Sequence, residues 1–542
     1  MKFPAPDFDF PQSTAHGQQH LWHFRGSAAK LRRVTKLAAQ SEYFSTHHLR
    51  ADLRGRSVRG GVVMMANQGA SFVLGIVSVA VLARLLTPAD FGLIAMVTAI
   101  TGVVTMFKDA GLSMATVQRE TVTHEQVSTL FWINIALSIA LVVILAALAP
   151  VIAWFYGEPR LIWVTLAFAG IFLLGGLSIQ HEALLRRQMR FTALAAISTG
   201  SMAVAIAAAI SAAALGLGYW SLVIQVAVSA AANVVLVWLS CGWRPKRAVR
   251  GSGVRPMLAF GGNLTAFTFI NYFARNADNV LVGWWWGAGP LGFYSKAYQL
   301  LMLPITQING PMSSVALPAL SRLQDDPVRF KRFYFKAIGL MVSLGMPLVA
   351  FLFVEARDVI LLVLGHQWLP AVPIFRALGV AAFVGTFNVA SGWVYTALGR
   401  TDRMLKWQLI MTPLTLASFV IGLPWGVLGV AIAFSAVNVV MRLPGLLYCY
   451  AGTSITLREF ILAIWEPAVA SIVAAAATYL IMAIWTAASA LVATLSSLVL
   501  FSTVYLLLMV TTAGGRAMIF EVLRFVRDVR QRAEGPGVIP EA

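Results

Sequence analysis

Apolar stretches long enough to cross a membrane recur along most of this chain. A membrane-spanning helix needs ~20 predominantly apolar residues, and that length predicts fourteen spans here. They cover residues 61–85, 91–112, 127–149, 161–183, 191–214, 217–239, 256–283, 291–317, 334–354, 372–398, 404–424, 427–449, 464–485 and 489–512. The segment 355–371 is partly apolar but too short to cross, and we interpret it as an interfacial turn. The predicted fold class is an all-α polytopic membrane protein with about 14 transmembrane helices.

Composition excludes a soluble protein. Hydrophobic residues make up 59% of the 542 and charged residues only 12%, whereas soluble domains carry about 25% charged residues. The net charge of +19 does not indicate nucleic-acid binding, because the cations collect in short connections between the spans. Connections rich in Lys and Arg stay in the cytoplasm. Alternate connections have this character, including those with Arg186, Arg244, Arg322 and Arg400. The pattern predicts a multi-pass protein with both termini cytoplasmic.

A short sequence pattern occurs twice, 200 positions apart. Residues Val81–Gly92 join two apolar stretches through a tight turn at Pro88. Residues Leu281–Gly292 repeat the apolar residues, a turn with Pro290 and the final glycine in the same register. A long-period repeat inside a hydrophobic chain predicts two related halves, which is one construction of membrane transporters.

Both ends of the chain are polar and basic. Residues 1–60 hold ten Lys or Arg and no apolar run, which predicts a cytoplasmic extension rather than a signal peptide. His16 and His20 have metal-ligand spacing, but no Cys or carboxylate joins them, so contact with anionic headgroups is the favoured interpretation. In the tail, 513–542, apolar residues recur at helical spacing. We predict an amphipathic helix in the inner interface, and a partner-binding helix is the alternative.

Aromatic residues collect at the predicted outer ends of the spans, among them Trp284, Trp285, Trp286 and Trp368. Amphipathic rings prefer headgroup depth, so we interpret these residues as interfacial anchors. For the Trp triplet, stacking on sugar rings is the alternative.

No catalytic signature occurs, whether a phosphate-binding glycine loop, a paired-thiolate metal site or a nucleophile elbow. We therefore expect a transporter rather than an enzyme, with no metal and no bound cofactor. Ionisable residues inside spans then become the candidates, because each is expensive in hydrocarbon. Arg275 and Asp278 share one helical face with Asn271. A cavity-lining role and a structural ion pair are the two interpretations.

Four further polar residues are candidates for the same cavity. Lys296 either faces it or extends to the outer interface. Lys108 and Asp109 lie near the inner end of the second span, where Lys108 can reach the headgroups. Asn67 stands among small residues, so close helix packing competes with cavity lining. Cations inside the membrane would offset the cost of carrying an anionic headgroup.

Several runs of residues resemble one known family over about residues 60–450. They are Leu82–Gly92, Phe107–Ser113, Gly218–Val223, Asp278 with Gly283, Leu291–Tyr294, Leu317–Leu323, Gly365–Pro370 and Ala397–Arg400. Together they resemble the polysaccharide transporter family of lipopolysaccharide and exopolysaccharide exporters. That family belongs to the multidrug/oligosaccharidyl-lipid/polysaccharide flippase superfamily. The basic extension 1–60 lies outside the resemblance.

The resemblance implies two six-helix lobes around a central cavity, at 61–239 and 256–449, and two further helices at 464–512. It implies alternating-access transport of a polyprenyl-diphosphate-linked oligosaccharide across a bacterial inner membrane, with a polymerase or export machinery as partner. It also implies coupling to a cation gradient, H⁺ or Na⁺, for which Asp278 is the first candidate. An ion-coupled small-molecule antiporter of the multidrug type is the alternative function. An oligosaccharide polymerase and a structural scaffold are less favoured.

Overall fold

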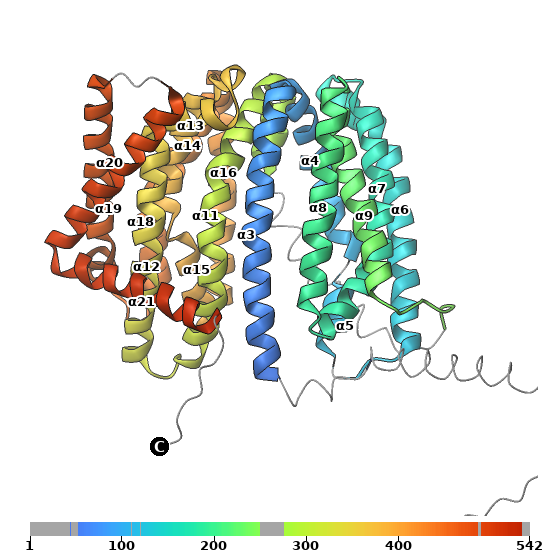
Figure 1. The fold of residues 1–542 in the computed structure, drawn as a ribbon, viewed down its shortest axis with the longest axis horizontal. Coiled ribbons are helices and arrows are strands. Elements are labelled where there is room, and N and C mark those ends of the chain that lie inside the picture. The colour runs from blue at the N-terminus through green and yellow to red at the C-terminus, as the bar shows by residue number, and fades with distance from the viewer. Residues whose placement is uncertain are drawn as a thin grey trace, which may run out of the picture.

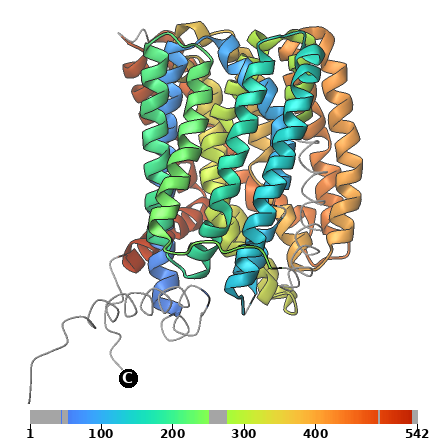
Figure 2. The ribbon, with the colours of Figure 1, turned by 90° about the vertical axis from the view of Figure 1, so that its right-hand side faces the viewer.

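The protein is a bundle of long helices (Figures 1 and 2). The computed structural model describes residue 44 and residues 53–109, 111–119, 121–249, 276–485 and 489–533. Within these residues, ten helical stretches are long and apolar enough to cross a membrane. The predicted all-α polytopic fold is confirmed. The number fourteen remains a prediction, partly because most of the span expected at 256–283 lies outside the described residues.

The first half of the chain forms the helices drawn from blue to green in Figure 1. They are α3 (Leu53–Leu85), α4 (Pro88–Asp109), α5 (Leu112–Gln118), α6 (His124–Tyr156), α7 (Leu161–Arg187), α8 (Phe191–Ala214) and α9 (Trp220–Ser240). α6 packs along α7, and α8 packs along both α9 and α3. A capping box between Thr123 and Gln126 begins α6, and Gly157 ends it with a φ of 65° that favours glycine. A four-residue connection therefore suffices to reach α7.

The second half continues with residues 276–286, which are helical, and with the helices α11 to α18. These are α11 (Ala288–Arg322), α12 (Pro327–Val354), α13 (Ala356–Val363), α14 (Ala371–Gly385), α15 (Asn388–Ala397), α16 (Thr401–Gly422), α17 (Gly426–Val440) and α18 (Arg442–Tyr450). Two short 3₁₀ turns, η1 (His366–Trp368) and η2 (Leu423–Trp425), join them. The segment expected to be an interfacial turn, 355–371, contains α13 and η1 rather than a span.

The chain ends with α19 (Leu457–Ile484), α20 (Ala490–Thr511) and α21 (Ala513–Ala533). α21 is the predicted tail helix, and it lies across the lower end of the bundle in Figure 1. Lys336 Nζ of α12 pairs with Glu521 Oε1 of α21 at 2.9 Å. Gly339 of α12 has no Cβ, which leaves room for the side chain of Met518. α21 therefore packs on α12, and its contact with a lipid surface or a partner remains a prediction.

The two repeated turns pack against each other at one end of the bundle, the top in Figure 1, which we call the hairpin end. A Cβ added to Gly92 would lie 1.7 Å from the carbonyl oxygen of Ala288, and one added to Gly292 would lie 1.9 Å from that of Pro88. Positions 92 and 288 correspond to 292 and 88 in the repeat. The contact is therefore reciprocal, as expected for a pseudo-two-fold pair, and both positions need glycine.

Two further contacts join the halves at the same end. Gly283 approaches Tyr156, which ends α6 in the first half. At the corresponding position, the carbonyl of Ala83 accepts a hydrogen bond from Trp368 Nε1 at 2.8 Å. Trp368 is fully buried, so its predicted role as an interfacial anchor is wrong. Its ring lies between the halves instead, in edge contact with Phe91. Because the indole N–H finds an acceptor there, burial of this side chain costs little.

Candidate functional site

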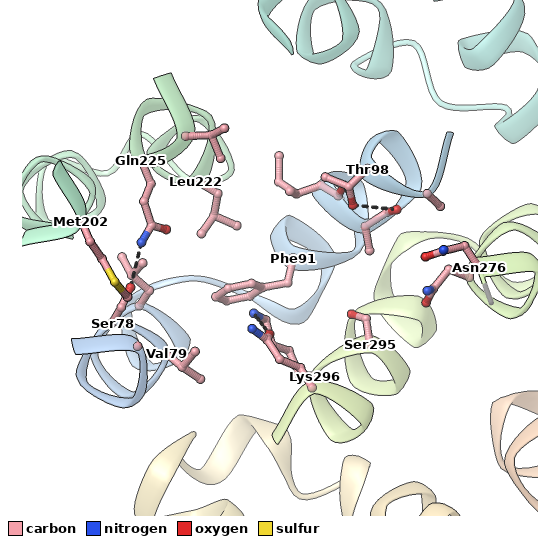
Figure 3. A pocket seen from close by; sticks show the side chains of 18 residues that line it. Ser78, Val79, Phe91, Thr98, Met202, Leu222, Gln225, Asn276, Ser295 and Lys296 are labelled. Atoms are coloured by element: carbon pink, nitrogen blue, oxygen red, sulfur yellow. Dashed lines mark hydrogen bonds between the residues drawn. The ribbon is translucent and has the colours of Figure 1, made fainter. Parts of the chain in front are cut away.

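A cavity of about 450 Å³ lies where the two halves meet, just below the hairpin end. Its lining comes from α3, α4, α8 and α9 of the first half, and from residues 276–279 and α11 of the second. Figure 3 shows polar side chains on both sides, with Ser78 and Gln225 on one and Asn276 and Lys296 on the other. The two halves therefore build one site together.

Lys296 is the charged residue in the lining of this cavity. Its ammonium lies 4.2 Å from the centre of the Phe91 ring, and it donates to Gln299 Oε1 at 2.8 Å. The first contact is a cation–π interaction across the two halves. Of the two interpretations left open by the sequence, the structure therefore shows Lys296 facing the cavity (Figure 3). The described residues offer no carboxylate within ion-pair distance of it.

Asp278 lies behind the cavity lining. It is 6% exposed, and its carboxylate accepts hydrogen bonds from the Tyr294 hydroxyl at 2.9 Å and from the Asn279 backbone N–H at 2.8 Å. Tyr294 is itself buried, at the start of α11. The bond joins the helix 276–286 to α11, on either side of the repeated turn. The structure thus shows a structural partner for Asp278, and a part in ion coupling stays a prediction.

A second cavity, of about 390 Å³, continues from the first along α3 and α11. Asn67 and Gln68 line it from α3, and Gln307 lines it from α11. The side chain of Asn67 also accepts a hydrogen bond from Thr199 of α8, so cavity lining and helix packing both apply to it. Gln68 Nε2 donates to Gln307 Oε1 at 2.9 Å, a further bond between the halves.

A third cavity, of about 500 Å³, lies inside the first half between α7, α8 and α9. It shares Met202, Gln225 and Val226 with the first cavity. Its polar lining residues were not among the candidates chosen from the sequence, which were the charged and most conspicuous polar groups. A signal was present, because Gln225, Ser229 and Asn233 recur every four residues inside the apolar stretch 217–239.

The other predicted site residues cannot be placed in this arrangement. Arg275 and Asn271 lie outside the described residues. Lys108 and Asp109 lie in the last turn of α4, and their side chains are also outside the described part. Among the described residues, no group of three or more His, Cys, Asp or Glu could hold a metal ion.

Comparison with known proteins places this geometry in a family. Residues 81–373, more than half of the chain, match the family described as polysaccharide biosynthesis protein. The chain is 26% identical over 406 residues to the lipopolysaccharide biosynthesis protein WzxC of Escherichia coli K12, which covers 73% of this chain and 81% of WzxC. It is 24% identical over 357 residues to the succinoglycan biosynthesis transport protein ExoT of Rhizobium meliloti, covering 65% and 71%.

A solved structure shares the fold. The inward closed conformation of the lipid II flippase MurJ superposes with a TM-score of 0.67 over 83% of this chain and 98% of MurJ. The sequence identity is 14%, so this superposition shows a common fold alone. The family match covers both repeated turns, the hairpin-end contacts and most of the residues that line the cavity between the halves. The chain therefore belongs to the polysaccharide biosynthesis protein family, as its sequence motifs indicated.

Proposed function

We propose that this protein is a flippase that moves a polyprenyl-diphosphate-linked oligosaccharide from the inner to the outer leaflet of a bacterial cytoplasmic membrane. The product would serve the synthesis of a surface polysaccharide, as lipopolysaccharide or exopolysaccharide. The family description and the names of WzxC and ExoT support this context, and ExoT is named as a transport protein. The fold shared with a lipid II flippase supports the class of substrate.

The observation that carries the proposal is the environment of Lys296. This ammonium faces a membrane-embedded cavity, against an aromatic ring and an amide, without a carboxylate partner in the described part of the chain. An unpaired charge at such a depth costs several kcal/mol. A diphosphate that enters the cavity would supply the missing anion and form a charge-assisted hydrogen bond. The cavity therefore favours an anionic headgroup over a cationic drug.

The reciprocal turn contacts support an alternating-access cycle. They close the hairpin end, while the cation-rich connections lie at the opposite ends of the spans. If those connections are cytoplasmic, both termini lie in the cytoplasm and the cavity is closed toward the outside. Movement of the two halves about the glycine contacts would then open the outer side. We propose that a gradient of H⁺ or Na⁺ drives this movement, and that the lipid-linked sugar leaves chemically unchanged.

The test is transfer of a polyprenyl-diphosphate oligosaccharide in liposomes that contain only the purified protein. Lectin binding or glycosidase cleavage on the opposite face reports the transfer. We expect protein-dependent transfer, and a rate lower by roughly 10- to 100-fold for Lys296→Gln, because one hydrogen bond to a charged group is worth about 1.5–3 kcal/mol. Lys406→Gln is the matched control. Lys406 is exposed on α16, where its Nζ lies 3.9 Å from Asp402 Oδ2 of the same helix.

Each negative result has a separate meaning. No transfer by the unchanged protein, with ion gradients and several glycans, would favour a small-molecule antiporter. Normal transfer by Lys296→Gln would show that another group binds the diphosphate.

A further inference from the structure

Two polar stripes face each other across the third cavity. On α9, Gln225, Ser229 and Asn233 are four residues apart, so they share one face of the helix. On α7, Ser178 and Glu182 are also four residues apart and share a face. All five line the same cavity of about 500 Å³, and we name them the polar lane. Polar side chains repeated this regularly within apolar spans indicate a ligand rather than lipid.

We propose that the polar lane binds the sugar part of the lipid-linked oligosaccharide while Lys296 holds the diphosphate. The inference rests on the proposed function and divides the substrate between two subsites. The two cavities are neighbours, because Met202, Gln225 and Val226 line both. Gln225 marks the passage, where its Nε2 donates to Ser78 Oγ of α3 at 2.9 Å (Figure 3). A glycan attached to a diphosphate at Lys296 can thus extend along α9.

The side chains of the lane match the chemistry of sugar hydroxyls. A sugar hydroxyl both donates and accepts, as do amide and hydroxyl side chains. Asn233 Oδ1 is buried and has no hydrogen-bond partner in the described part of the chain. Leaving a buried acceptor unpaired is unfavourable, so a ligand hydroxyl that donates to it binds with advantage. Asn233 is therefore the residue whose role in binding is most directly indicated.

The size and charge of the lane favour a glycan over a bound metal cation. Oxygen ligands surround a bound cation such as Ca²⁺ at about 2.3–2.6 Å, which requires a compact cage. A volume of about 500 Å³ instead falls within the roughly 300–1,000 Å³ of pockets for organic ligands. The carboxylate of the lane, Glu182, lies 3.8 Å from the guanidinium of Arg186. A carboxylate also accepts hydrogen bonds from sugar hydroxyls, so Glu182 is compatible with a hydroxyl-rich ligand.

The test compares two lipids on the detergent-purified full-length protein by native mass spectrometry. The probes are polyprenyl diphosphate without sugar and the same lipid carrying neutral oligosaccharides. We expect the unchanged protein to bind the sugar-bearing lipid more tightly. Asn233→Leu should reduce that preference about fivefold, the value of one hydrogen bond, without weakening the bare lipid. Ser229→Phe should abolish the preference by filling the lane, and it tests the same idea by a steric route.

Two further variants separate the subsites. Lys296→Gln should weaken both lipids equally, because it acts on the diphosphate. Gln408→Leu is the matched polar-to-leucine control, since Gln408 is exposed on α16 and donates to Thr412 of the same helix. It should change neither affinity.

Three results would overturn the inference. The first is equal affinity of the protein without substitutions for both lipids, while it still flips the lipid that carries sugar. That result would leave the proposed function intact. The second is an unaltered preference in both Asn233→Leu and Ser229→Phe. The third is loss of the response to an ion gradient in Asn233→Leu with the sugar preference kept, which would make the lane an ion path. An unchanged protein that neither binds nor flips either lipid would instead remove the proposed function.

Discussion

Replacing Gly92 by alanine tests whether the reciprocal turn contact closes the hairpin end. The added Cβ would lie 1.7 Å from the carbonyl oxygen of Ala288 and 2.5 Å from its carbonyl carbon. Both are backbone atoms, so no flexible side chain can move away. Contacts of a Cβ below 3.0 Å essentially do not occur, and α4 and α11 must therefore separate locally by about 1.3 Å, the difference between 1.7 and 3.0 Å.

In the proposed cycle the cost falls on the closed state alone, because the two turns would separate when the hairpin end opens. Overpacking of a close contact costs typically 1–3 kcal/mol. Taking about 2 kcal/mol, the ratio of open to closed protein rises about 30-fold. The substitution should therefore shift the population toward a form that is open at the hairpin end rather than unfold the helices.

Labelling of a cysteine in the cavity measures this shift. Ser295 lines the cavity of Lys296, so Ser295→Cys reports access from the hairpin end to a membrane-impermeant maleimide. The native Cys241 and Cys449 are buried and are replaced by alanine. We expect Gly92→Ala to accelerate labelling from the hairpin side by at most about 30-fold. Gly289→Ala is the control, because no atom lies within 4 Å of a Cβ added there. Equal labelling rates in Gly92→Ala and the parent protein would refute the closure by these turns.

Two further predictions concern buried acids. Tyr294→Phe removes the hydroxyl that donates to Asp278 at 2.9 Å and should destabilise the protein by about 1–3 kcal/mol. We expect a lower thermal-unfolding midpoint in detergent for Tyr294→Phe. Tyr479→Phe, at an exposed position on α19, should leave the midpoint unchanged. Burial raises the pKa of Glu355, between α12 and α13, above its usual 4.5, so the folded state binds this proton more tightly than the unfolded state. Stability should therefore fall as the pH rises from 4.5 through the raised pKa. Glu355→Gln should remove that part of the pH dependence, and an unchanged midpoint-versus-pH curve would contradict it.

The helices were predictable because hydropathy and length are local properties. The stretch predicted at 191–214 coincides with α8, and the limits of α7 and α20 differ from prediction by a few residues. The repeat was also visible in the sequence as Pro88 and Pro290 with their following glycines. The contact between the two repeated turns was not predictable, because Gly92 meets Ala288 only when the two halves fold against each other.

The polar residues show the limit more sharply. Lys296 had two interpretations in the sequence, since a position near a span end says nothing about the direction of the side chain. Trp368 was assigned to the interface and lies fully buried between the halves. Asn233 was not a candidate although it recurs with Gln225 and Ser229 every four residues, because helical spacing alone does not show which part of the structure that face meets. In each case the deciding contact comes from another helix, often more than 100 positions away.

The sequence by itself determined a helical membrane protein, the approximate limits of its described spans, its internal repeat and its family. Those properties follow from the composition and order of residues within each segment, because the length, hydropathy and flanking charges of each helix govern its insertion into the bilayer. Only the tertiary structure decided which polar side chains share a cavity, which glycines touch and which end of the bundle is closed. These depend on how each helix is rotated against its neighbours, and close packing between distant residues sets that rotation.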